Sequence, residues 1–125
     1  MLTHAIVTAT GGLEMTIGQS GASTLVRLNG RVNIDSSPEF RNQLLALLQR
    51  ESSEAIMVDL ADVPYMDTSG IATLVEALKI ARQRKIVFCL RGLTGSVLHL
   101  FEVTGLLALF EASGCLTSSS ESNES

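Results

Sequence analysis

The chain has 125 residues, of which 46% are hydrophobic and 18% are charged, and this composition predicts one globular domain rather than a disordered chain. Thirteen acidic residues outnumber nine basic ones, giving a net charge of −4, which argues against a nucleic-acid-binding groove. No run approaches the ~20 apolar residues of a membrane span and no signal peptide is recognisable, so we expect a cytoplasmic protein that is not inserted in a membrane.

Composition divides the chain into three parts. Residues 1–12 end in two glycines and are predicted to form a flexible leader, whereas residues 13–115 are predicted to form the folded domain. Residues 116–125 are rich in serine and glutamate, which predicts a disordered tail. Cys89 lies in an apolar run, which predicts a buried free thiol.

The first third of the chain is expected to be mostly extended. Three runs are predicted to be strands or extended segments: 14–17, 23–28 and 31–34. A helix is predicted to follow, because Ser36 and Glu39 fit a capping box and Pro38 suits the first helical turn. The apolar side chains of this helix fall on one face: Phe40, Leu44, Leu47 and Leu48.

The remaining chain alternates between strands and helices. Strands are predicted at 56–60 and 85–90, and helices from Ser69 to about Arg84 and from about Ser96 to Val103. Gly105 is expected to end the latter helix with a left-handed cap. Residues 106–111 fit either a short strand or a final helix. This order predicts an α/β fold, a single domain in which helices pack against a mixed β-sheet.

The run Asp67-Thr68-Ser69-Gly70 is the most informative polar segment, because it joins a buried strand to an amphipathic helix. Hydroxyl groups at a helix N-terminus lie beside unpaired backbone N–H groups and the positive end of the helix dipole. A phosphate is well tolerated at such a position. Simple helix capping is the competing interpretation, since Asp, Thr and Ser are preferred capping residues. Tyr65 and Met66 add apolar surface beside this turn, as a docking site would.

A second polar cluster, residues 30–36, contains Asn33 and Asp35 and precedes the first helix. A turn followed by a helix cap would explain it. The alternative is that its polar tip joins the segment 67–70 in one surface.

Catalytic and metal chemistry have little support in the sequence. The two histidines, His4 and His99, lie far from Ser69 along the chain, and the segment lacks the G-x-S-x-G pattern of a serine nucleophile. Three carboxylates, Asp59, Asp62 and Asp67, bracket one loop, so a weak Mg²⁺ site is conceivable, although Asp59 is expected rather to accept local hydrogen bonds. We expect no metal site, no cofactor and no enzymatic activity. An enzymatic alternative would use Asp67 in phosphotransfer or hydrolysis.

Several segments in the same order resemble the STAS-domain family, and specifically the bacterial anti-sigma factor antagonists. The resemblance covers about residues 14–112 and includes Gly30-x-Val32-Asn33-x-x-Ser36, the strand 56–60 and the run Met66 to Ile71. It continues in the strand 86–90 and in Val97-x-x-Leu100-Phe101-x-x-Thr104-Gly105-Leu106. Thr68 stands where many of these antagonists have serine, and Asn33 stands where aspartate is common.

The resemblance implies a regulatory protein that binds an anti-sigma factor, itself a serine/threonine kinase, and thereby controls sigma-factor-dependent transcription. It implies phosphorylation at Thr68, with Ser69 as the second choice and as the expected helix cap, and dephosphorylation by a PP2C-type phosphatase. The expected partner-binding residues are Asn33, Asp35, Tyr65, Met66, Asp67, Thr68, Ser69 and Gly70. The alternative is a STAS adaptor, not phosphorylated, of an ABC lipid transporter or a stress-signalling scaffold. A monomer or weak dimer is expected.

Overall fold

Short apolar runs separated by polar turns fold into one sheet and four helices in the computed structural model, which describes residues 4–10, 12–50, 54–112 and 116–118. The strands are β1 (His4–Thr10), β2 (Leu13–Ser20), β3 (Ser23–Val32), β4 (Ala55–Met66), β5 (Val87–Leu93) and β6 (Leu116–Ser118). The helices are α1 (Ser37–Leu48), α2 (Thr68–Gln83), α3 (Gly95–Val103) and α4 (Leu106–Ala112).

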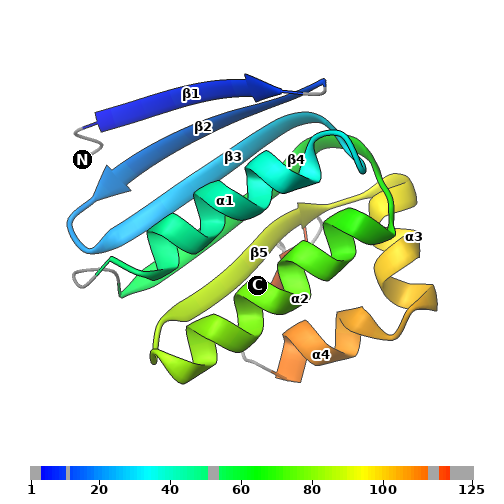
Figure 1. The fold of residues 1–125 in the computed structure, drawn as a ribbon. Coiled ribbons are helices and arrows are strands. Elements are labelled where there is room, and N and C mark those ends of the chain that lie inside the picture. The colour runs from blue at the N-terminus through cyan, green and yellow to red at the C-terminus, as the bar shows by residue number, and fades with distance from the viewer. Residues whose placement is uncertain (1–3, 11, 51–53, 113–115, 119–125) are drawn as a thin grey trace.

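The six strands lie in the sheet in their order along the chain. Strands β1, β2 and β3 are antiparallel, whereas β3, β4, β5 and β6 are parallel, so the predicted mixed sheet is confirmed. Helix α1 connects β3 to β4, and α2 connects β4 to β5. Both helices therefore begin at the carboxyl-terminal edge of the parallel strands, and they lie side by side on the same face of the sheet (Figure 1).

The two ends of the chain differ from the expected leader and tail. Residues 4–10 form β1, which pairs with β2 from His4 opposite Gln19 to Thr10 opposite Leu13. Residues 5–8 are Ala-Ile-Val-Thr, a run that favours a strand. The prediction of a flexible leader gave more weight to the two glycines that follow. At the other end, Leu116–Ser118 form β6 beside β5. Residues 119–125, predicted to be disordered, lie outside the described part of the chain.

Cys89 is buried in β5 and is disulfide-bonded, so the prediction of a free thiol is wrong. The other cysteine of the sequence, Cys115, lies outside the described residues. Spacing rules missed the bond because they recognise metal ligands and C-x-x-C pairs, not cysteines far apart in the chain.

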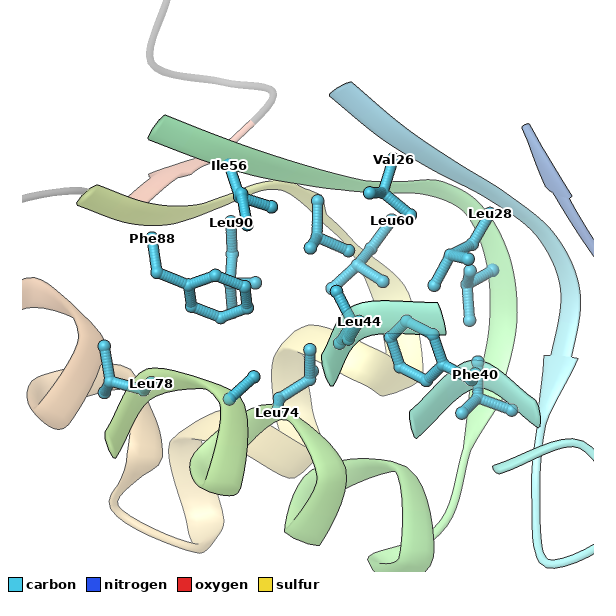
Figure 2. Packing of buried hydrophobic residues seen from close by; sticks show 14 of the residues in the cluster. Val26, Leu28, Phe40, Leu44, Ile56, Leu60, Leu74, Leu78, Phe88 and Leu90 are labelled. Carbon is cyan, nitrogen blue, oxygen red and sulfur yellow. The ribbon is translucent and has the colours of Figure 1, made fainter. Parts of the chain in front are cut away.

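The main core lies between α1, α2 and one face of the sheet (Figure 2). Along β3, buried Thr24, Val26 and Leu28 alternate with Arg27 and Asn29, which are exposed. The strand therefore turns its apolar face toward the helices. All four apolar residues predicted for the inner face of α1 are buried: Phe40, Leu44, Leu47 and Leu48.

Residues 106–111, which the sequence left open between strand and helix, belong to helix α4. Gly105 precedes it with φ of 78°, so the predicted left-handed cap after α3 is confirmed. The aromatic ring of Phe110 lies 5.8 Å from that of Phe101 and 6.4 Å from that of Phe88, measured between ring centroids. These contacts pack α4 against α3 and β5.

Candidate functional site

Helix α2 begins immediately after β4, and its N-cap is Asp67. The backbone of Asp67 is extended, and its carboxylate oxygen Oδ1 accepts hydrogen bonds from the backbone N–H of Ser69 at 2.9 Å and of Gly70 at 3.4 Å. Ser69 lies inside the first turn of the helix, so the expectation that Ser69 caps α2 is wrong. A residue in that position has its backbone N–H, rather than its side chain, directed toward the N-cap.

The carboxyl group of Asp67 has a lowered pKa. The main cause is the hydrogen bond donated by the Ser69 hydroxyl, and the backbone N–H groups of Ser69, Gly70 and Ile34 lower the pKa further. Partial desolvation opposes this shift. Asp67 is consequently ionised at neutral pH, and its negative charge lies at the positive end of the α2 dipole.

Thr68 and Ser69 are neighbours in sequence, but their hydroxyl groups have different surroundings. Thr68 is the first residue of α2 and is exposed, and its hydroxyl has no hydrogen-bond partner within the described residues. Ser69 is half-buried, and its hydroxyl contacts both Asp67 and, at 2.9 Å, the hydroxyl of Ser37 in α1. The accessible hydroxyl of this turn therefore belongs to Thr68.

The second polar cluster forms a turn between β3 and α1. The side-chain oxygen of Asn33 accepts hydrogen bonds from the backbone N–H of Asp35 at 2.9 Å and of Ser36 at 3.1 Å. The Ser36 hydroxyl donates to the Arg31 carbonyl at 2.9 Å and makes no capping bond to α1. The predicted Ser36–Glu39 capping box is therefore wrong, because the buried Ser36 side chain satisfies the turn that precedes it.

The fold brings the two polar clusters together. The backbone N–H of Asp67 donates to the carbonyl of Val32 at 3.0 Å, and Ser37 meets Ser69 across the helix starts. Farther along the helices, Arg41 of α1 forms a two-point ion pair with Glu76 of α2, at 2.7 and 2.8 Å. Between these contacts lies a groove of about 410 Å³, lined by Ile34, Ser37, Pro38, Arg41, Asn42, Ser69, Ala72, Thr73 and Glu76.

The eight residues expected to contact a partner divide into a surface set and a supporting set. Asn33, Asp35, Tyr65, Asp67, Thr68 and Ser69 are at least partly exposed. Met66 and Gly70 are buried and lie close together within the chain, and their contact with a partner stays a prediction.

Two nearby side chains were missed by the sequence reasoning. Ile34 is 72% exposed, unusual for a large apolar residue, and it adjoins the groove. The guanidinium of Arg31 lies 5.6 Å from the centre of the Tyr65 ring. The sequence signal for Ile34 was an apolar residue inside an otherwise polar turn.

A metal site finds no support in the part of the chain that the structure describes, where no three His, Cys, Asp or Glu side chains converge. Asp59 accepts a hydrogen bond from the backbone N–H of Ala61 at 3.0 Å and pairs with Arg91, so the expected local bonding is confirmed. His99 is exposed on α3. Among the described helices none has the length and apolar character needed to cross a bilayer.

Known proteins match this chain in sequence. The sequence profile of the STAS domain matches residues 14–122. An anti-sigma-B factor antagonist from Listeria monocytogenes is 33% identical over 82 residues, which cover 66% of this chain and 71% of the relative.

Solved structures show the same fold. A STAS domain protein from Planctomyces limnophilus superposes with a TM-score of 0.72 at 17% identity, covering 86% of this chain and 92% of that one. The Bacillus cell fate determinant SpoIIAA in its phosphorylated form gives a TM-score of 0.66 at 13% identity, covering 86% and 93%.

Proposed function

The chain belongs to the STAS domain family, and on that premise we propose that it is an anti-sigma factor antagonist. In this proposal it binds an anti-sigma factor that is also a serine/threonine kinase, and phosphorylation at Thr68 switches the binding off. The chain acts in the cytoplasm on sigma-factor-dependent transcription, as a binding protein without a cofactor. A PP2C-type phosphatase restores the unphosphorylated form, and the chain works as a monomer or weak dimer.

The observation that carries the proposal is the exposed hydroxyl of Thr68 at the start of α2, which has no hydrogen-bond partner in the described part of the chain. A kinase must bring its nucleotide within bonding distance of the acceptor oxygen, so the acceptor has to be accessible. Support also comes from the names of the curated relatives and from a structural neighbour that was solved in a phosphorylated form.

The chemical step is a phosphoryl transfer from ATP held by the kinase. The Thr68 hydroxyl oxygen forms a bond to the γ-phosphorus, and the bond from that phosphorus to the β,γ-bridging oxygen breaks. ADP leaves, and the hydroxyl proton passes to a base of the kinase. Asp67 belongs to the acceptor surface and is not assigned a catalytic role.

The added phosphate would weaken partner binding through charge. It brings about −1.5 to −2 charges to a surface that already carries Asp67 and Asp35. A loss of ~2–3 kcal/mol from repulsion and desolvation corresponds to ~30–150-fold weaker binding. The phosphate also lies at the positive end of the α2 dipole, which favours it within this chain. The switch therefore acts on the interface and leaves the fold intact.

Phosphate mapping tests the proposal. The full chain is incubated with ATP and a candidate anti-sigma kinase, and the modified residue is located by tandem mass spectrometry. Thr68→Ala is expected to abolish labelling, and Thr68→Glu to weaken kinase binding by roughly 30-fold or more in calorimetry.

Thr94→Ala is the matched control, because Thr94 is an exposed threonine at the start of α3 whose side chain makes no capping bond. It should be labelled like the unaltered chain. Undiminished labelling of Thr68→Ala would refute the switch. Full kinase binding by Thr68→Glu would favour an adaptor that works without phosphorylation.

A further inference from the structure

Ser69 is the chemical rival of Thr68 as a phosphate acceptor. Its hydroxyl donates to the Asp67 carboxylate, which could take up the proton released when the Ser69 oxygen attacks phosphorus. On that ground alone Ser69 would be the better nucleophile, since the Thr68 hydroxyl has no such neighbour in the described structure. Partial burial already disfavours Ser69, and a second feature of the site acts on the Ser69 oxygen itself.

That feature is the contact between α1 and α2 made by two hydroxyl groups. The Ser37 and Ser69 oxygens lie 2.9 Å apart, although the residues are separated by 32 positions in the chain. The Ser69 hydroxyl donates its proton in a hydrogen bond to Asp67, whose ionised carboxylate can only accept hydrogen bonds. Ser37 must consequently be the donor in this pair, and one lone pair of the Ser69 oxygen is occupied.

We propose that Ser37 is a specificity-determining residue, which engages the Ser69 oxygen and so directs the phosphate to Thr68. This inference rests on the proposed function. Ser37 is itself 5% exposed and begins α1, so its side chain is largely enclosed by the chain.

The geometry explains how one hydroxyl decides between two acceptors. The Ser69 oxygen is bonded to its own carbon, donates to Asp67 and accepts from Ser37, which leaves a single lone pair for an incoming phosphorus. Removing the Ser37 oxygen frees a second lone pair and opens space on the groove side of Ser69. Asp67 already accepts the Ser69 proton, so the variant would join a neighbouring base to a less obstructed Ser69 oxygen.

The test compares the site of phosphorylation in variants of the full chain. Ser37→Ala, incubated with ATP and the kinase that labels the unaltered chain, is expected to raise the ratio of phosphoserine 69 to phosphothreonine 68 at least tenfold. Ser37→Thr keeps a hydroxyl at this position and should restore the original ratio. Ser37→Cys serves if Ser37→Ala does not fold, because the thiol keeps the side chain and is only a weak donor.

Thr73→Ala is the matched control. Thr73 is also buried and lines the same groove, but its hydroxyl donates to the main-chain carbonyl of Ser69 at 3.0 Å and does not touch the Ser69 hydroxyl. The ratio of the two phosphorylated residues should remain unchanged in this variant. A similar rise in Thr73→Ala and Ser37→Ala would show that any loosening of the groove suffices, and would overturn the assignment to Ser37.

The outcomes separate the two proposals. A chain labelled at Thr68 whose ratio is unaffected by Ser37→Ala and Ser37→Cys overturns the role of Ser37 and leaves the phosphorylation switch standing. A chain that takes no phosphate at either residue overturns the switch itself. NMR titration of the Asp67 carboxyl carbon gives a readout that needs no kinase. Its pKa should rise in Ser37→Ala, because Ser69 loses the donor that polarises its own hydroxyl, and should not change in Thr73→Ala.

Discussion

The side chain of Asp67 has several roles in the turn before α2. Its carboxylate caps α2, accepts the Ser69 hydroxyl and places a negative charge beside the exposed Thr68. The capping bonds fix the first turn of the helix, and the charge adds to the repulsion that a phosphate on Thr68 would create. A substitution at Asp67 therefore alters stability and the proposed switch together, and the two effects have to be measured separately.

Replacing Asp67 should lower stability in a pH-dependent manner. Asp67→Ala is expected to lose about 1 kcal/mol of unfolding free energy at pH 7, whereas Asp67→Asn should lose less because an amide oxygen still caps. The folded-state pKa of Asp67 lies below its ordinary value of 3.8. The charge-dependent contribution is thus complete above that value and disappears as the pH falls through the folded-state pKa.

Urea unfolding at pH 7 and near pH 3 measures this contribution. The difference between the unaltered chain and Asp67→Asn should shrink as the pH falls below 3.8, because protonation of the carboxylate removes its charge-dependent contribution. A difference that stays constant with pH would mean that the carboxylate charge contributes nothing to the helix start.

At the scale of elements, α2 can approach the sheet closely because residue 70 is glycine. A Cβ added to Gly70 would lie 2.6 Å from Cγ1 of Val32 in β3 and 2.7 Å from Cγ of Met66 in β4. Both neighbours are buried, so neither has open space to move into. The backbone of Gly70 has no positive φ, and the requirement for glycine is therefore one of space and not of conformation.

Gly70→Ala should consequently destabilise the protein by about 1–3 kcal/mol. Helix propensity alone predicts the opposite sign, a gain of about 1 kcal/mol. Ala72→Gly in the same turn is the control, since Ala72 is exposed and its replacement should cost about 1 kcal/mol by propensity alone. A gain in the urea midpoint for Gly70→Ala would contradict the close packing of α2 on β3 and β4.

The helices and strands were largely predictable where the spacing of apolar residues clearly matches a helix or a strand. The apolar spacing of α1 and α2 and the short apolar run in β4 predicted their positions, but β4 extends beyond the predicted 56–60 to Met66. Residues 61–66 include Pro64 and polar side chains, which weaken a strand signal. Shifts in the β3–β4 register after Arg27 accommodate this irregular stretch, and such shifts are not readable from local sequence.

The site was predictable to the extent that it depends on neighbouring residues. Asp67 and Thr68 were identified from their side-chain types at a strand-to-helix junction. The Ser37–Ser69 contact was not, because it depends on how two helices pack, and neither was the internal bonding of Ser36, which competes with a capping role. Burial of Met66 was missed because the segment around it reads as a loop.

At the scale of the whole molecule, three phenylalanines join the last helices to the sheet. Phe110 of α4 and Phe101 of α3 are fully buried, and Phe88 of β5 is nearly so. Their rings form a cluster at the side of the core next to α3 and α4. The integrity of the fold should therefore depend on α4, although α4 contributes no residue to the candidate site.

Phe110→Ala should lower the free energy of unfolding by about 3–5 kcal/mol, because it removes a fully buried ring and leaves a cavity. This is a large share of the ~5–15 kcal/mol typical of a natural domain. Chemical denaturation measures the loss, with exposed Ala108→Ser on the same helix as the control, expected to change stability by less than about 0.5 kcal/mol. A loss below 1 kcal/mol for Phe110→Ala would show that α4 is not part of the cooperative unit.

The hydroxyl contact that spans α1 and α2 also has a thermodynamic consequence. A molecule bound in the groove would contact Ser69, the chain neighbour of Thr68, so its binding and phosphorylation of Thr68 would be coupled through the start of α2. Such coupling is reciprocal. If phosphorylation lowers the affinity for that molecule by some factor, binding of the molecule lowers the equilibrium constant of phosphorylation by the same factor. A change in the fraction of chains with an occupied groove would then change the phosphorylated fraction, and the reverse.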